Sequence, residues 1–277
     1  MLKRILKIAA LVVAIGLIAF ALVFANALVG NPISKAIASD TAEKHLAEEY
    51  SDKDFDIERI TYSFKDGYYH AYVSSASSID SDFTLIIDMW GNLLSDSYED
   101  RVLGGWNTSD RIRNDYRNMT DAILDSPLFP YDVHIGYGDI EFYPREHAEK
   151  YPIPDYAMIT DDLVLDAFYD LYELGKKHGK LTVYIYDETV SVDRLSEILL
   201  DIKAVFDDGG VNFYVIDCVL EYPKSEDGPK REGRVEVMDF LYSDIYEDGM
   251  SARVSASNDA ANAYYAEQDA EKLNEKL

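Results

Sequence analysis

The chain has 277 residues, of which 52 are acidic and 26 are basic, so its formal net charge is −26. Proteins that bind nucleic acids through the phosphate backbone need cation-rich surfaces, and this composition therefore argues against that class of function. It also disfavours docking on an anionic lipid surface, whereas solubility and the binding of cations or basic partners stay open.

An uncharged apolar run from Ile8 to Val29 is the first predicted element. Its 22 residues extend roughly 33 Å as a helix, which is enough to cross a hydrocarbon core of about 30 Å. We therefore expect residues 1–30 to form a cytoplasmic tail and a transmembrane anchor that contacts the lipid bilayer. A cleavable secretory signal is the alternative, because the run follows basic residues and Ala25 and Ala27 have the spacing of a cleavage site.

Basic residues flank this run unequally. Lys3, Arg4 and Lys7 precede it, whereas Lys35 and Lys44 are the only basic residues among the first twenty that follow. Cytoplasmic flanks carry the excess of Lys and Arg, so this bias favours an N-terminus in the cytoplasm. We expect a single-pass protein of the cell membrane with extracellular C-terminal domains, and cleavage of the run delivers these domains to the same side.

Residues 31–103 have the pattern of a small N-terminal α+β domain. A helix with small and apolar residues on one side precedes three strand-like runs, Phe55 to Phe64, Tyr68 to Val73 and Phe83 to Asp88. Turn signals separate these runs, which therefore predict an antiparallel meander. Residues 104–130 then predict a connecting helix.

Residues 131–245 predict a second α+β domain with the element order β-α-β-α-β-β. Its first helix is expected to follow Thr160-Asp161-Asp162 directly, with Phe168 on its apolar face, and residues 246–277 predict a C-terminal helical tail. The predicted fold class is thus α+β, with an N-terminal transmembrane helix followed by two small α+β domains.

Cys218 is the only cysteine, which excludes an internal disulfide. It lies in the apolar run Val215-Ile216-Asp217-Cys218-Val219-Leu220, where a thiol is typically a small buried strand residue. A nucleophilic cysteine needs an electropositive setting, and this run supplies none. We therefore predict a structural role for this thiol.

Several residues between Asn31 and about Val102 have a recognisable spacing. They are Asn31-Pro32, then Ala42, Leu46 and Tyr50, then Phe55, Tyr72-Val73 and Phe83, and finally Asp88, Gly91, Asp96 and Tyr98. In this spacing the stretch resembles the YfjL-like proteins of Gram-positive bacteria. It is also similar to PepSY-like modules, in which one helix packs on a short antiparallel sheet. The resemblance implies a fold and a location in the cell envelope, but no catalytic residues.

Asp52, Asp54 and Asp56 have the alternating spacing of a calcium-binding loop. Such a loop also needs a glycine at its sixth position and a bidentate glutamate at its twelfth. Here those positions hold Ile57 and Ser63, so the motif fails and the acids more simply precede a strand. Adventitious calcium binding is the alternative at this place.

Other catalytic and ligand-binding patterns are missing from the sequence. There is no G-x-S-x-G elbow and no phosphate-binding loop. The histidines have no metal-ligand spacing; they are His45, His70, His134, His147 and His178. We therefore predict no catalytic, cofactor-binding or metal-binding residues and no cofactor. The tyrosines with Trp90 and Trp106 leave open a carbohydrate-stacking surface instead of simple packing.

These observations favour a protein that is not an enzyme. We expect an extracytoplasmic binding or regulatory protein of the bacterial cell envelope, with a secreted or wall-associated protein as its partner and no nucleic acid. The alternative is an envelope hydrolase or polysaccharide-active enzyme that uses carboxylates of the second domain. A deep pocket that holds two close carboxylates, one with a raised pKa, would favour this alternative.

Overall fold

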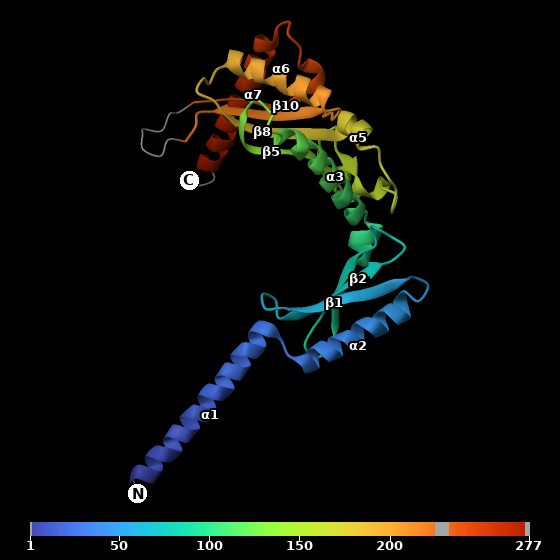
Figure 1. The fold of residues 1–277 in the computed structure, drawn as a ribbon, viewed down its shortest axis with the longest axis vertical. Helices are drawn as coiled ribbons and strands as arrows, with labels where there is room; N and C mark the ends of the chain where they lie inside the picture. The colour runs from blue at the N-terminus through green and yellow to red at the C-terminus, as the bar shows by residue number, and fades with distance from the viewer. Residues whose placement is uncertain (1, 225–232, 275–277) are drawn as a thin grey trace. The chain divides into compact units, whose positions relative to one another are not determined.

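The computed structural model describes residues 2–224 and 233–274, and these residues fall into two units (Figure 1). Unit 1 comprises Met1–Thr108 and Val164–Asp166, and unit 2 comprises Ser109–Leu163 and Ala167–Leu277. Each unit contains its own sheet and its own buried apolar core. The α+β class with two sheet-containing domains is confirmed.

The chain begins with helix α1, Leu2–Val29. Among the described residues, however, no helix combines the length and the hydropathy that crossing a membrane requires. The prediction of a transmembrane helix from Ile8 to Val29 is corrected accordingly. The side chains of Ala25 and Ala27 lie outside the described part.

Unit 1 packs one helix on a four-stranded antiparallel sheet with the strand order β1-β2-β3-β4. Its elements are α2 (Pro32–Glu49), β1 (Phe55–Ser63), β2 (Tyr68–Ser75), β3 (Phe83–Ile87) and β4 (Leu93–Asp96). The meander predicted from three runs therefore continues into a fourth strand. A short π-helix, Glu99–Leu103, follows it.

Small residues let α2 lie close to this sheet. Asn31 caps the helix by accepting a hydrogen bond from the Ser34 backbone N–H, 2.8 Å away. Ala38 and Ala42 are fully buried against the sheet residues of the core, among them Leu85. Alternation along the strands leaves mainly polar side chains on the opposite face of this sheet, among them Arg59, His70 and Thr84.

Unit 2 has a four-stranded mixed sheet with the order β10-β9-β8-β5. Its strands are β5 (Asp132–Ile140), β8 (Gly179–Tyr186), β9 (Val215–Glu221) and β10 (Arg234–Leu241). The short strands β6 (Phe142–Tyr143) and β7 (Met158–Ile159) form a separate two-stranded sheet. Its helices are α3 (Trp106–Leu124, in unit 2 from Ser109), α4 (Arg145–Lys150), α5 (Leu171–His178), α6 (Val192–Asp208) and α7 (Met250–Asn274). Strands β8 and β9 are parallel, and α6 supplies the crossover that a parallel pair needs.

The two faces of the unit 2 sheet differ in chemistry. Residues of one face pack with α3 and α6 in the core; they include Leu181, Val183 and Ile185 of β8 and Ile216, Cys218 and Leu220 of β9. Cys218 is fully buried in β9, which raises the pKa of its thiol to about 12 and confirms the predicted buried strand position. The alternate residues, including Lys180 and Asp217, lie on the opposite face, which we call the polar face.

The predicted helix after Thr160-Asp161-Asp162 is misplaced. These three residues form a 3-10 turn, and α5 begins only at Leu171 with Asp170 as its N-cap. Phe168 is 89% exposed and lies on no helix. The intervening Asp166, at a φ of +60°, instead accepts hydrogen bonds from the backbone N–H groups of Ile79 and Asp80 in unit 1. This long-range contact prevents the helix from starting where the local pattern predicts it.

Candidate functional site

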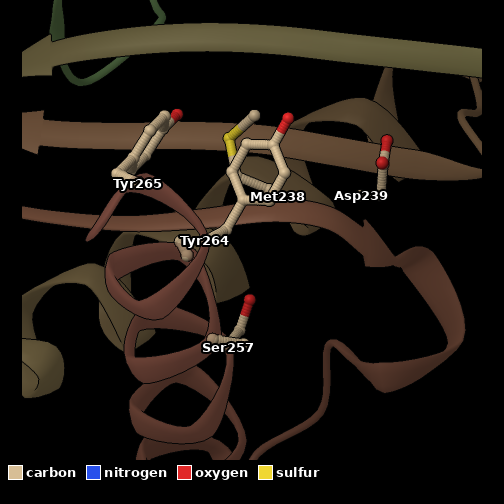
Figure 2. Close-up of a pocket in the computed structure, with 7 residues that line it drawn as sticks. Met238, Asp239, Ser257, Tyr264 and Tyr265 are labelled. Carbon is tan, nitrogen blue, oxygen red and sulfur yellow. The ribbon is translucent and has the colours of Figure 1, made fainter. Parts of the chain in front are cut away.

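A cavity of about 400 Å³ lies in unit 2 between α7 and β10 (Figure 2). Its lining residues come from one strand and one helix: Met238 and Asp239 of β10, and Ser257, Ala260, Ala261, Tyr264 and Tyr265 of α7. The lining thus combines one carboxylate, two phenol rings, a thioether and small side chains. We call it the α7–β10 cavity.

The course of α7 explains how this cavity arises. Its first turns are anchored in the core, where Met250 and Val254 are buried. Asn258 then reaches the edge strand β10, because its Oδ1 accepts a hydrogen bond of 3.0 Å from the Glu236 backbone N–H. Edge strands present such unpaired groups, and this side chain satisfies one of them. Beyond this point α7 continues along β10, which brings Tyr264 and Tyr265 to the cavity.

A β-bulge in β10 brings Asp239 into the cavity lining. Val237 pairs with Cys218 and Phe240 pairs with Ile216, so two residues of β10, Met238 and Asp239, stand opposite the single residue Asp217. Asp239 has a φ of +46°, a region that aspartate tolerates better than most residues. Its backbone N–H donates a hydrogen bond of 2.7 Å to Asp217 Oδ1, which holds the bulge closed.

Lys180 joins the two carboxylates on the polar face. Its Nζ lies 2.9 Å from Asp217 Oδ2 and 2.8 Å from Asp239 Oδ1. Burial by itself favours the neutral amine, but the hydrogen bonds to Asp239 and Asp217 outweigh it and hold the pKa of Lys180 above its usual value. Burial also raises the pKa of Asp217, against the opposing effects of the Asp239 N–H and Lys180. The three groups therefore form a charge-paired support at the bulge, in which the side chains of Lys180 and Asp217 are 16% and 10% exposed and that of Asp239 reaches solvent.

Tyr156 extends this support away from the sheet. Its hydroxyl lies 2.7 Å from Asp239 Oδ1 and 3.3 Å from Glu141 Oε1, and burial raises its pKa. His178 holds the Tyr156 backbone through a contact of 2.8 Å between Nδ1 and the carbonyl oxygen. Lys180 Nζ is also 3.9 Å from Glu141 Oε1, so three carboxylates surround one ammonium group. Their formal charges leave this cluster negative.

A second ion pair borders the α7 side of the cavity. Glu236 is only 2% exposed and pairs with Arg234 on the same strand. The Arg234 guanidinium lies over the Tyr265 ring, 5.8 Å from its centroid. The Tyr265 and Tyr264 rings in turn meet edge to face, with centroids 5.7 Å apart. Arg234 is therefore neutralised by Glu236 and helps to position the aromatic wall.

The residues singled out from the sequence lie elsewhere or apart from one another. Each of the five histidines has its own neighbour: His45 contacts Asp96, His70 contacts Asp66, His134 contacts Glu221, His147 stacks on Tyr143, and His178 contacts Tyr156. Asp54 accepts hydrogen bonds from Ser75 and Ser77, and no group of His, Cys, Asp and Glu in the described ranges could hold a metal ion. Trp90 is exposed at the β3–β4 turn of unit 1, while Trp106 is half-buried at the start of α3.

Sequence reasoning missed the residues of the cavity and its support. Lys180 and Asp217 do carry a signal, since each is a charged residue beside an apolar strand sequence whose alternate positions form the core. A buried charge in such a place needs a partner, so the two residues could have been paired. Asp239 carries no comparable signal, because its place depends on the bulge.

The comparisons with known proteins concern both halves of the chain. No curated protein and no solved structure matches it. The family model described as YfjL-like, N-terminal domain matches residues 5–95. The model described as YfjL-like C-terminal domain matches residues 115–255, just over half of the chain; this range includes Met238 and Asp239 of the cavity lining and ends before the lining residues of α7. The chain therefore belongs to the YfjL-like family.

Proposed function

We propose that this chain is a binding protein without catalytic activity, and that unit 2 holds part of its partner in the α7–β10 cavity. The observation that carries the proposal is that a carboxylate and two aromatic rings are exposed around the α7–β10 cavity. Asp239 has a side chain that is 55% exposed, while Tyr264 and Tyr265 are 60% and 39% exposed. Exposed aromatic rings beside a polar group are typical of interaction sites.

The support beneath the cavity favours a preorganised site. The bulge, the positive φ of Asp239 and the buried pair of Lys180 and Asp217 all restrict where the Asp239 carboxylate lies. A group that is already held in place loses little conformational freedom when a partner binds. The cost of ordering the carboxylate then offsets less of the free energy that contacts with the partner contribute.

The geometry supports hydrolysis less well. The Asp217 and Asp239 carboxylates both contact Lys180 Nζ, and burial raises the pKa of Asp217, as one member of a carboxylate pair in a hydrolase would require. However, Lys180 contacts both carboxylates, and Asp217 is 7% exposed and is not part of the cavity lining. A general acid must reach the bond that it protonates. A binding role therefore accounts for more of the site than a hydrolytic one.

We further propose a role at the bacterial cell envelope, with a secreted or wall-associated protein as the partner. The support for this address is the resemblance of the first half to YfjL-like proteins of Gram-positive bacteria and to PepSY-like modules. Unit 1 has the layout of such a module, with α2 packed on a small antiparallel sheet. In this proposal unit 1 offers a second interaction surface and the α7–β10 cavity offers the first.

The test is selection of ligands from a random peptide library displayed on phage, with the immobilised full chain as bait. The selected peptides are then measured against Ala260→Trp, which places an indole in the cavity, and against Ala266→Trp, an exposed position of α7 outside the lining. We expect Ala260→Trp to weaken binding at least tenfold and Ala266→Trp to leave it unchanged. Peptides that bind both variants like the unaltered chain, or a selection that enriches none, would refute the proposal.

A further inference from the structure

We infer that the α7–β10 cavity recognises the ammonium group of a lysine side chain in the partner. This inference rests on the proposed function and specifies the chemistry of its ligand. Charge, aromatic lining and the hydrogen bonds already made by Asp239 each point to it.

The charge of the site favours a cation. Glu141, Asp217 and Asp239 surround Lys180, so the cluster keeps an excess of negative charge after the internal pairing. Arg234, a second cation that the structure describes near the cavity, is paired with the buried Glu236. The whole chain has a formal net charge of −26, which attracts basic segments and repels acidic ones over longer distances. A basic ligand is therefore complementary to the site and to its surroundings.

The walls of the cavity suit an alkylammonium group. Figure 2 shows the Tyr264 and Tyr265 rings extending from α7 near Met238 and Asp239 of β10. Phenol rings attract a cation through their negative faces, and a flexible thioether packs well against a methylene chain. A lysine side chain can thus place its stem against the rings and Met238 while its charged end reaches Asp239.

The existing contacts of Asp239 favour lysine over arginine. Its Oδ1 already interacts with Lys180 Nζ at 2.8 Å and with the Tyr156 hydroxyl at 2.7 Å. Within the described residues no hydrogen bond reaches its Oδ2. A guanidinium pairs best with both oxygens of a carboxylate at once, whereas an ammonium group acts as a point charge and needs only one. The single remaining oxygen therefore suits the ammonium group.

The experiment follows the Met238 methyl group, which lines the cavity, by NMR of the full chain labelled with [¹³C-methyl]methionine. The Met238→Leu variant assigns its signal among the 6 methionines. The probes are four acetylated pentapeptides that differ only in the central residue: lysine, arginine, norleucine or Nε-acetyl-lysine. We expect the lysine peptide to shift the Met238 signal saturably, with affinity at least threefold above the arginine peptide and tenfold above the two uncharged ones.

Matched variants separate the charge of Asp239 from the charge of the whole chain. Asp239→Asn keeps the shape and an acceptor for Lys180, and it should weaken the lysine peptide about tenfold. Glu58→Gln removes the same charge from an exposed position of β1 in unit 1 and should have no effect. If Asp239→Asn does not fold, Tyr264→Leu takes its place, and loss of the ring should weaken the lysine peptide several-fold.

The outcomes keep the inference distinct from the proposed function. If norleucine binds as tightly as lysine, or if phage-selected peptides bind in the cavity without a basic residue, the inference is wrong and the binding role stands. An arginine peptide that binds more tightly than the lysine peptide also overturns it. The inference is also wrong if no pentapeptide shifts the Met238 signal while the phage-selected peptides do. The cavity would then recognise something other than a single ammonium group.

Discussion

The two sheets of this protein differ in how exposed the polar groups are on the face opposite the core. In unit 1 that face carries groups such as Arg59 and Tyr72, which lie in contact with solvent and pair with each other, with the guanidinium 4.2 Å from the ring centroid. In unit 2 the corresponding face buries charges, since Asp217 and Glu236 are 7% and 2% exposed. Exposed ion pairs contribute little to stability, whereas buried charges are costly unless they are paired.

The difference indicates where function is to be sought. Evolution can place polar groups on an exposed sheet face with few constraints, and unit 1 is of this kind. Unit 2 maintains a half-buried lysine, a buried aspartate and a residue at positive φ in one place, which is a combination that lowers stability unless every member is satisfied. Clusters of this type are often retained for a site.

The largest expected effect comes from removing the buried cation. Lys180→Met leaves Asp217 and Asp239 without their shared partner, and we expect unit 2 to lose about 3 kcal/mol of unfolding free energy. Urea unfolding followed by hydrogen-exchange mass spectrometry separates the two units and measures this loss. Lys176→Met, which removes an exposed cation paired with Glu173, should leave the free energy of unfolding nearly unchanged. Equal costs for the two variants would show that the polar face of unit 2 is solvated like that of unit 1.

The next largest effect is expected at Asp166, in the segment Val164–Asp166 that belongs to unit 1. Asp166→Ala removes the acceptor for the backbone N–H groups of Ile79 and Asp80 and for the Ser78 hydroxyl, and alanine tolerates the positive φ of this position less well than aspartate. We expect unit 1 to lose about 2 kcal/mol and unit 2 to change little. The control is Asp162→Ala, an exposed acid paired with Arg145, which should cost less than about 1 kcal/mol. Unchanged hydrogen exchange in residues 78–82 of the Asp166 variant would contradict this assignment.

The smallest expected effect is a difference between the two units in how their stability depends on pH. In unit 1 hydrogen bonds from Ser75, from the Tyr68 backbone and from Asn92 lower the pKa values of Asp54, Asp66 and Asp88, respectively. A lowered pKa in the folded state contributes stability above the unfolded value of about 3.9, and this stability is lost as the pH falls through the folded values.

Two acids of unit 2 act in the opposite sense. Burial raises the pKa of Asp121 and of Asp217, so their cost is fully present above the folded values and is relieved as the pH falls towards about 3.9. Asp161, whose pKa is lowered by the Arg145 backbone N–H, reduces this difference in part. Hydrogen exchange between pH 6 and pH 3 should therefore show unit 1 losing protection before unit 2. If both units lost protection at the same pH, the shifted pKa values of these acids would not make the two units differ in acid stability.

Local patterns predicted the layers of the fold well and its irregularities poorly. Apolar runs identified β2, β3 and β9, because the core face of a strand is set by the period of the element itself. The helix expected after Thr160 failed because Asp166 is bound by a turn in unit 1. The transmembrane assignment of Ile8 to Val29 rested on the length of an uncharged apolar run and on the cations before it, and no helix of the described residues supports it.

By itself the sequence determined the acidic character of this protein, its two α+β units and the buried position of Cys218, since all three follow from composition or from short-range periodicity. Only the tertiary structure decided that Lys180, Asp217 and Asp239 meet beneath a cavity. The physical reason is that strand pairing and a bulge bring together residues from three strands far apart in the chain. No local pattern records the register in which those strands pair.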